Sequence, residues 1–386
     1  MNSINKKTIF IFIVTLILLS CLTVIGLSKD GVDYSKKEIR IAGVDSVTGK
    51  YGDYGTGNKR GQELAIAEIN EKGGIQSGPL KGFKLKGDFF DDKGDAKEAA
   101  NIARKISVGD YLVAVGPTMS SPALSIAPVL YRQRVPGIVT YAQAISLTQQ
   151  GFDNIIRLTY TTKSVGCLMA DEIANNIKKH RVSIIVENQD YGQQLVKSFV
   201  GRIKEKKYDI KIISQDVVVP GQDIDFRSVI LKAKAKKPDM LFIAVCYNEG
   251  GMIVRQARKM GWTVPMYGPN SLTEAKFFEL AGDLGEFYIE ASQSLKVSGG
   301  FAGDYIAKYN TEAPMSAIFG YDGVKIAARI IEMGGVDRES FIGKLRKVSM
   351  PGLGNPVYEF DEYGDVKAPA LVMMTGEEFK EEYNIK

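Results

Sequence analysis

The sequence has very little of the chemistry that most metal centres and nucleophilic sites require. Its 386 residues include one histidine, one tryptophan and three cysteines. A zinc site needs several His or Cys ligands, and a serine triad needs a histidine base. His180 stands among basic residues between an expected helix and an expected strand, where we expect it to face solvent. We therefore expect no metal, no cofactor and no catalysis.

Long blocks of like charge are also missing, so we expect no nucleic-acid partner. The formal charge is +5, and removing Lys6 and Lys7 with an N-terminal leader lowers it to +3. The hydrophobic fraction of 45% and the charged fraction of 25% are ordinary for a globular protein. The length suits two domains.

The N-terminus differs from the rest of the chain. Two lysines precede an apolar run at residues 8–27, about 20 residues and thus long enough to cross a bilayer. A basic start followed by an apolar run is typical of an export signal. Three outcomes stay open for residues 1–28: lipidation at Cys21, which ends a lipobox-like motif, cleavage near residues 26–28, or an uncleaved anchor. All place the protein in the periplasm or on the outer face of the cytoplasmic membrane.

Two cysteines, Cys167 and Cys246, lie beyond this leader. They stand in separate expected elements, and sequence does not give the distance between them. A disulfide and two separate buried thiols both stay open, with the thiols favoured.

Strand and helix patterns alternate from residue 38 onwards. Apolar strand-like runs include residues 39–44, 83–90, 181–187 and 240–245, and helical patterns follow them. Such alternation predicts parallel sheets covered by helices on both faces. The rhythm occurs twice, so we expect an α/β fold of two doubly wound lobes. Ligands of such sheets bind beyond the carboxyl ends of the strands.

The first strand-end loop, residues 48–57, is rich in glycine and tyrosine and precedes a helix expected over 58–72. Its glycines match neither the dinucleotide fingerprint nor the P-loop. Tyr51 and Tyr54 are suited to forming a wall against an apolar ligand. An ordinary glycine-rich turn is the alternative.

The second such loop, residues 116–122, ends in Ser120, Ser121 and Pro122. We expect Ser121 to be the N-cap of a helix with Pro122 at its first position. The unpaired N–H groups of a helix start, with hydroxyls beside them, form an anion site. A ligand carboxylate fits there, although helix capping alone explains the same residues.

Several motifs follow one another along the chain: Gly61-Gln-Glu-Leu-Ala-Ile-Ala-Glu-Ile-Asn70, Asp190-Tyr-Gly192, Val254-Arg-Gln-Ala-Arg-Lys-Met-Gly261 and Tyr267-Gly-Pro269. In this order and spacing they resemble the leucine/isoleucine/valine-binding proteins, the type I periplasmic solute-binding components of ABC importers. The resemblance covers about residues 38–375.

The resemblance implies a clamshell whose chain crosses between the lobes three times. We expect residues 38–157 and 290–360 in lobe 1, and residues 158–289 and 361–386 in lobe 2. The ligand lies in the cleft, and an ABC permease recognises the form closed around it. We expect a monomer.

The resemblance also assigns ligand contacts. Ser120 matches the family serine that holds the ligand carboxylate. Tyr54 matches the first-lobe tyrosine, and Tyr191 the second-lobe tyrosine that covers the ligand. Tyr247 falls near another family position whose aromatic side chain forms a wall of the ligand site. Phe319 falls near an apolar family position beside the pocket for the ligand's side chain.

Two departures from the family affect the ligand's amino group. Ala142, Gln143 and Ala144 stand where the family usually has serine, alanine and threonine, and that threonine helps to bind the group. Asn270 follows a Gly-Pro pair, where amino-acid-binding relatives commonly place an acid. Glu249 is a substitute for this acid or a helix cap. A buried ammonium without a counter-charge costs on the order of several kcal/mol.

We therefore predict the binding subunit of a branched-chain-amino-acid-type ABC importer that captures a small carboxylate-bearing solute. An aliphatic amino acid is slightly favoured. An aromatic acid or a urea-like amide is the alternative solute, and a ligand sensor for a signalling receptor is the alternative role.

Overall fold

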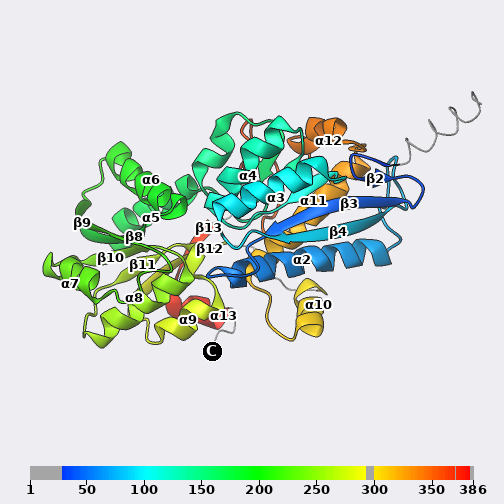
Figure 1. Cartoon of the computed structure of the whole chain (residues 1–386). Helices are drawn as coiled ribbons and strands as arrows, with labels where there is room; N and C mark the ends of the chain where they lie inside the picture. The colour runs from blue at the N-terminus through cyan, green and yellow to red at the C-terminus, as the bar shows by residue number, and fades with distance from the viewer. Residues whose placement is uncertain (1–27, 293–299, 370, 383–386) are drawn as a thin grey trace, which may run out of the picture.

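The computed structural model describes residues 28–292, 300–369 and 371–382. Two lobes lie side by side, each built on one sheet with helices on both faces (Figure 1). The predictions for residues 1–27, including lipidation at Cys21, lie outside the described residues. Within the described ranges, no helix combines the length and the apolar character needed to cross a membrane.

Lobe 1 contains a seven-stranded sheet whose parallel strands lie in the order β4, β3, β5, β6, β7, with β1 and β2 joined to β3. The strands are β1 (Ser28–Lys29), β2 (Val32–Asp33), β3 (Glu38–Asp45), β4 (Lys84–Asp91), β5 (Val113–Val115), β6 (Gly137–Val139) and β7 (Ile155–Arg157). The helices are α2 (Gly52–Glu71), α3 (Ala96–Val108), α4 (Ser120–Arg132), α10 (Gly300–Tyr309), α11 (Met315–Glu332) and α12 (Arg338–Leu345).

Lobe 2 contains a six-stranded sheet in the order β9, β8, β10, β11, β12, β13, of which the first five are parallel and β13 is antiparallel. The strands are β8 (Arg181–Glu187), β9 (Lys211–Val218), β10 (Met240–Ala244), β11 (Met266–Gly268), β12 (Phe287–Ser292) and β13 (Leu371–Thr375). The helices are α5 (Thr162–Glu172), α6 (Asp190–Lys206), α7 (Arg227–Ala235), α8 (Tyr247–Lys259), α9 (Ala275–Ala281) and α13 (Gly376–Glu382).

Both sheets repeat one topology. In each sheet, the second parallel strand along the chain (β4 or β9) lies at the edge beside the first (β3 or β8). The third (β5 or β10) lies on the other side of the first. The order of connection therefore reverses between β3 and β5 in lobe 1, and between β8 and β10 in lobe 2. Ligands of doubly wound sheets bind beyond the carboxyl ends of strands at such a reversal. The predicted fold of two doubly wound lobes is confirmed.

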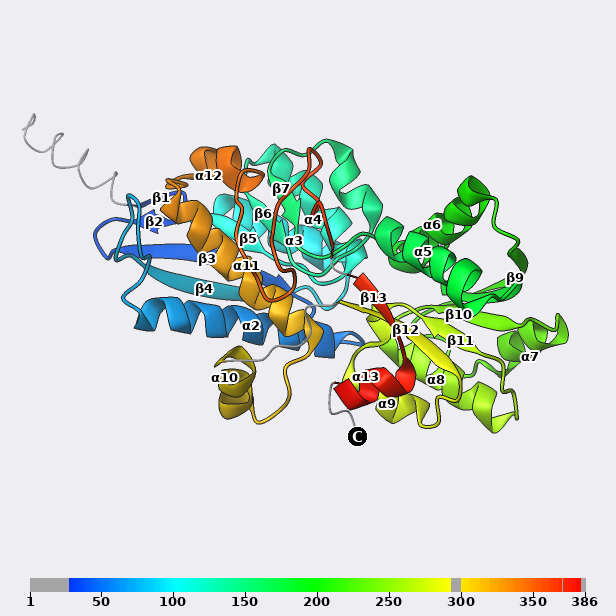
Figure 2. The same cartoon turned by 180° about the vertical axis from the view of Figure 1, so that it is seen from behind.

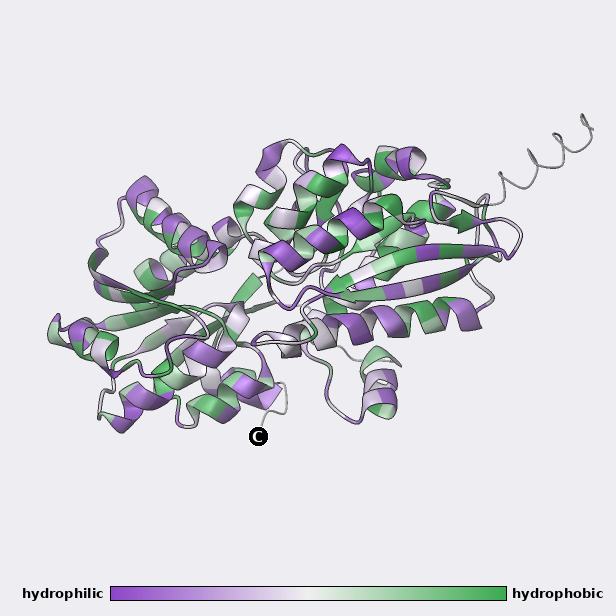
Figure 3. Cartoon of the chain, in the orientation of Figure 1, coloured by the Kyte–Doolittle hydropathy of each residue, from purple (hydrophilic) through white to green (hydrophobic). Residues whose placement is uncertain are grey.

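The sequence pattern of α3 shows how the helices attach to the sheets. Its buried residues Ala99, Ile102, Ala103 and Ile106 recur at the spacing of one helical face. Figure 3 shows the resulting alternation of hydrophobic and hydrophilic bands along the helix. The carboxylate of Asp95 accepts hydrogen bonds from two first-turn N–H groups and fixes where α3 begins.

The described elements place three passages of the chain between the lobes: from β7 to α5, from β12 to α10, and before β13 (Figure 2). The expected change of lobe at residue 290 falls inside β12, which belongs to the second sheet. The expected change at residue 361 is also too early. Phe360 forms an antiparallel β-bridge with Val366. Between them, the Gly364 carbonyl accepts a hydrogen bond from the Arg157 N–H of β7, a strand of lobe 1. Lobe 1 therefore extends to about residue 366.

The expected loop at residues 48–57 is mostly helix, since α2 begins at Gly52 rather than at residue 58. The glycines allow close contact between α2 and its neighbours. A Cβ atom on Gly55 would lie 2.2 Å from the Ser46 backbone, and one on Gly61 would lie 1.9 Å from the Ala317 carbonyl oxygen of α11. These glycines let two helices and a strand end pack at the point where the lobes meet.

We predict opposite effects for two helical glycine-to-alanine substitutions. Gly61→Ala forces α2 and α11 apart and should lower the free energy of unfolding by about 1–3 kcal/mol. Gly201→Ala in α6 meets no atom within 4 Å and should raise it by about 0.5–1 kcal/mol, because alanine favours helix. Urea unfolding of both variants tests this, and a Gly61→Ala variant as stable as Gly201→Ala would contradict the packing argument.

Candidate ligand-binding site

Loops from both lobes meet beyond the carboxyl ends of the strands at the two reversals of connection. The Tyr51 hydroxyl of lobe 1 donates to Gln189 Oε1 of lobe 2 at 3.0 Å. The Tyr54 hydroxyl donates to the Ser271 carbonyl, which follows β11. The structure is therefore a closed arrangement in which the loops that follow strands touch across the cleft.

Lys50 forms a second contact between the lobes, at the edge of the cleft. Its Nζ donates to the Pro220 carbonyl at 2.9 Å. Its own carbonyl accepts from the Tyr247 hydroxyl at 3.2 Å and from the Asn248 amide at 2.6 Å. One lobe 1 residue thus holds two separate parts of lobe 2.

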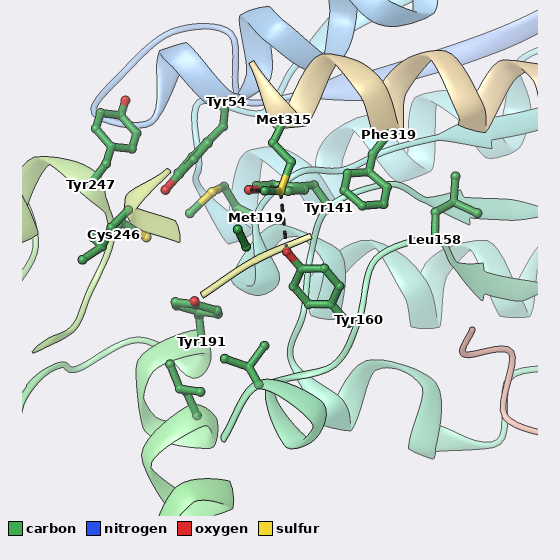
Figure 4. Packing of buried hydrophobic residues seen from close by; sticks show 14 of the residues in the cluster. Tyr54, Met119, Tyr141, Leu158, Tyr160, Tyr191, Cys246, Tyr247, Met315 and Phe319 are labelled. Carbon is green, nitrogen blue, oxygen red and sulfur yellow. Dashed lines mark hydrogen bonds between the residues drawn. The ribbon is translucent and has the colours of Figure 1, made fainter. Parts of the chain in front are cut away.

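Aromatic side chains fill the space between the lobes, as Figure 4 shows. The rings of Tyr54 and Tyr247 meet edge to face with centroids 4.7 Å apart, and Tyr141 lies 5.7 Å from Tyr54. Phe319 lies 5.7 Å from Tyr141 on the side away from the cleft and supports it. Tyr191 reaches the same region from α6. The structure brings the expected aromatic residues together, as a wall contributed by both lobes.

The start of α4 differs from the expected capping. The helix begins at Ser120, and the Ser121 hydroxyl donates to Asp190 Oδ2 of lobe 2 at 2.9 Å. Ser121 is therefore not the N-cap, because it is the second residue of the helix and Met119 occupies the N-cap position. Ser120 Oγ accepts from the Ala144 N–H at 3.2 Å. No side chain caps α4, so its first N–H groups are left for another acceptor.

The segment that contains Ala142 and Ala144 is held by a buried ion pair. Arg157 is fully buried, and its Nη1 donates to the Ala144 carbonyl at 2.7 Å and to the Ala142 carbonyl at 3.5 Å. Asp365 accepts from the same guanidinium at 2.6 Å. Burial lowers the pKa of Arg157, and the Asp365 carboxylate opposes that shift. Sequence reasoning missed both residues, although an arginine in an apolar strand is a usable signal.

Several buried polar atoms at the meeting point have no hydrogen-bond partner among the described residues. They include Gln143 Oε1, the Tyr191 hydroxyl and Asn270 Oδ1. Asn270 Nδ2 lies 3.5 Å from the Tyr141 hydroxyl, to which it donates. Buried polar groups are nearly always paired in proteins. Partnerless atoms from both lobes therefore indicate where the polar groups of a ligand bind.

Glu249 does not supply the missing charge beside Asn270. It lies in the first turn of α8, where its Oε1 accepts from the Gly221 N–H at 3.0 Å. Its structural role is to hold that loop of lobe 2.

Two other carboxylates are buried near the cleft and were missed from the sequence. Glu274 precedes α9, and Glu290 lies in β12. Burial raises the pKa of each to about 8, and the Asp53 charge adds to the shift of Glu274. Each has one carboxylate oxygen without a hydrogen-bond partner in the described part of the chain. Both groups therefore keep their protons at neutral pH unless a cation approaches them.

Two hollows bear on the position of the site. The smaller is a narrow gap between the lobes and is lined by Tyr51, Gly94, Met119, Ser120, Ser121, Pro122, Gln189 and Tyr191. The larger is an open groove along β4 that includes the Arg40–Asp88 ion pair. None of the expected binding residues lines the groove, so we place the site in the smaller hollow and the aromatic layer beside it.

Two predictions about reactive side chains, the state of the cysteines and the exposure of the histidine, can be compared with the structure. Cys167 and Cys246 are free thiols, so they form no disulfide. The His180 side chain is 58% exposed, as expected.

A closed pair of doubly wound lobes with a polar and aromatic layer between them defines a clamshell solute-binding protein. The family model described as "Periplasmic binding protein" matches residues 38–378. The chain belongs to this family, which confirms the resemblance found from the motifs.

Known relatives agree with this assignment. The Leu/Ile/Val-binding protein BraC3 of Rhizobium johnstonii is 28% identical over 302 residues, covering 77% of this chain and 80% of that protein. The LivJ substrate-binding protein of Streptococcus pneumoniae, solved in complex with isoleucine, superposes with a TM-score of 0.76 at 25% identity, covering 87% of this chain and 100% of that chain.

A third relative shows the breadth of the fold. A solute-binding protein of an R. palustris ABC transporter, solved with benzoate, has a TM-score of 0.77 at 16% identity, covering 86% of this chain and 92% of that chain. At that identity the likeness shows the fold alone.

We predict that stability without added ligand falls as pH rises between about 5.5 and 8.5. The folded state keeps the protons of Glu274 and Glu290 up to a pKa of about 8, whereas the unfolded chain releases them near 4.5. The folded state binds more protons in this window, so raising the pH favours unfolding. Glu290→Gln should flatten the slope by up to about 1.4 kcal/mol per pH unit. Denaturant unfolding across this range measures the slope, and one unchanged by Glu290→Gln would contradict it.

Proposed function

We propose that the protein is the extracytoplasmic substrate-binding subunit of an ABC importer of the branched-chain amino-acid type. It captures a small carboxylate-bearing solute between its lobes and delivers it to a membrane permease. The observation that carries this proposal is the start of α4 at Ser120, which no described side chain caps and which lines the same hollow as Tyr51 of lobe 1 and Tyr191 of lobe 2. The N–H groups at a helix start hold a carboxylate without a lysine or arginine.

The site residues take distinct roles in this proposal. Ser120 and the first turn of α4 hold the carboxylate, and Gln143 and Asn270 contact further polar atoms of the solute. Tyr54, Tyr191 and the aromatic side chains beside them cover its apolar part. Ser121 acts across the cleft through Asp190, so it stabilises closure rather than contacting the solute.

The solute favoured by relatives is an aliphatic amino acid. BraC3 is described as a Leu/Ile/Val-binding protein, and LivJ was solved with isoleucine. We further propose that the protein acts as a monomer, leaves the solute chemically unchanged, and works outside the cytoplasmic membrane as a free or lipid-anchored protein.

Thermal melting against a panel of solutes tests the ligand class. A branched-chain amino acid at about 100 times its dissociation constant should add about 2.7 kcal/mol to the free energy of unfolding. The panel should also contain benzoate, urea and acetamide. If leucine, isoleucine and valine give no shift while benzoate or an amide does, the amino-acid assignment is wrong, although the binding role stands.

The substitution Ser120→Ala tests the carboxylate end of the site. It removes a hydroxyl beside the α4 start and should weaken any carboxylate ligand by about 5- to 30-fold, or about 1–2 kcal/mol. Ser214→Ala is the control, since Ser214 Oγ donates to Ser183 within lobe 2 and away from the cleft. Isothermal titration measures both, and equal affinity in the Ser120→Ala variant would remove Ser120 from the site.

A further inference from the structure

Glu290 occupies an unusual place for a carboxylate. It lies in β12, whose Ile289 pairs with Gly268 just before the Asn270 turn. The residue is fully buried, and its Oε2 accepts from the Asn270 backbone N–H at 3.0 Å. Its Oε1 has no hydrogen-bond partner among the described residues. One carboxylate oxygen of Glu290 is thus hydrogen-bonded to the backbone, and the other has no partner in the described part of the chain.

Asp322, another buried carboxylate, shows the contrast. Asp322 accepts from the backbone N–H groups of Leu353 and Gly354 and from the Tyr358 hydroxyl. Its two oxygens are used inside lobe 1. Glu290 receives one such bond, and in the part of the chain that the structure describes no Lys or Arg nitrogen forms an ion pair with it. A buried carboxylate with so little compensation is costly unless a cation approaches.

Glu290 is close to the side chains that line the cleft. Burial raises the pKa of the Tyr141 and Tyr191 hydroxyls, and the charge of Glu290 raises both further. Tyr141 belongs to lobe 1 and Tyr191 to lobe 2, so the charge of Glu290 acts on tyrosines of both lobes. Asn270 connects Glu290 to Tyr141, since its backbone N–H donates to Glu290 and its side-chain amide donates to Tyr141.

We propose that Glu290 Oε1, together with Asn270 Oδ1, binds an ammonium group of the solute. Both oxygens are buried, both lack partners among the described residues, and both belong to one connected group beside the cleft. The negative charge that residue 270 does not carry is supplied from the adjacent strand. This inference rests on the proposed solute-binding function and narrows the solute to one with a carboxylate and an ammonium, such as an α-amino acid.

The arrangement also selects against solutes without the ammonium. An aromatic or aliphatic acid bound at Ser120 brings no cation to Glu290, whose pKa burial holds at about 8. The Glu290 carboxyl then keeps its proton at neutral pH and makes no ionic bond to such a solute. A neutral hydroxyl in place of the ammonium leaves Glu290 without a counter-charge, so a hydroxy acid should bind more weakly than the matching amino acid.

The experiment compares leucine with two analogues in which a hydroxyl or a hydrogen replaces the amino group: 2-hydroxy-4-methylpentanoate and 4-methylpentanoate. Isothermal titration of the unaltered protein should show leucine bound at least about 30-fold more tightly than either, because a charge-assisted bond is lost. In Glu290→Gln, leucine should weaken by at least about 30-fold while both analogues keep or gain affinity, so the preference disappears.

The control is Glu286→Gln, which changes an exposed carboxylate next to the start of β12 that accepts from the Tyr288 hydroxyl. This variant should keep the preference for leucine, and Glu274→Gln tests the other buried carboxyl near the cleft. Asn270→Asp added to Glu290→Gln returns a carboxylate to the same group and should restore part of the preference. A Glu290→Gln variant that still prefers leucine, or a Glu274→Gln variant that loses the preference instead, overturns the assignment of Glu290.

The outcomes separate the two proposals. If the unaltered protein binds no amino acid and no simple acid, the proposed carboxylate-binding function fails. If it binds 4-methylpentanoate as tightly as leucine, that function stands and the ammonium site is wrong. The comparison within the unaltered protein does not depend on the folding of any variant.

Discussion

The buried ion pair between Arg157 and Asp365 connects the parts on which the site depends. Arg157 ends β7, directly before the chain first leaves lobe 1, and Asp365 lies just before the chain leaves it for the last time. The same guanidinium fixes the carbonyls of Ala142 and Ala144. A buried pair of this kind is costly to break, on the order of 3–5 kcal/mol, because removing one partner strands the other charge. Two hinge segments and one wall of the cleft therefore share a single anchor.

The residues that line the cleft lie in the first turns of helices or just after strands, not in the middle of these elements. Tyr54 and Ser120 begin helices, Tyr191 and Tyr247 begin helices of the other lobe, and Asn270 follows a strand. The repeated strand order places the starts of α2, α4, α6 and α8 at the two reversals of connection, and Asn270 follows β11, the strand next to β10. The chemistry of the site is thus polar backbone and hydroxyl groups from lobe 1, facing carboxylate and amide oxygens from lobe 2. Such a division is suited to a solute with two oppositely charged ends.

Much of this arrangement was accessible from the sequence. Alternating strands and helices predicted the two lobes, and the motifs predicted which strand-end loops meet, including Tyr54, Ser120 and Tyr191. Local signals failed where tertiary contacts outweighed them. Glycines that read as a loop form the first turns of α2, because they permit contact with Ser46 and α11. Ser121 read as a helix cap, but Asp190 of the other lobe takes its hydroxyl.

Two of the residues that sequence reasoning missed share a feature. Arg157 and Glu290 are charged residues inside short apolar strands. Their roles depend on partners far along the chain, Asp365 for one and Asn270 beside Tyr141 for the other. Periodicity and turn chemistry report on neighbours a few residues away. They contain no information on which distant loop a buried charge will face.

The contacts of Lys50 have a consequence for how affinity and selectivity evolve in such a protein. Lys50 holds Pro220, Tyr247 and Asn248 of lobe 2 at the edge of the cleft, through its own amine and carbonyl. These bonds form between protein groups, so their strength sets the balance between the open and closed forms for every solute alike. Apparent affinity scales with the population of the binding-competent form. A substitution at Lys50 removes the bond from its amine to Pro220 and keeps the backbone carbonyl that accepts from Tyr247 and Asn248. The lost bond joins two protein groups, so the affinities for all solutes shift by a common factor and their ranking is kept. The overall affinity of such a protein can therefore change separately from its choice of solute.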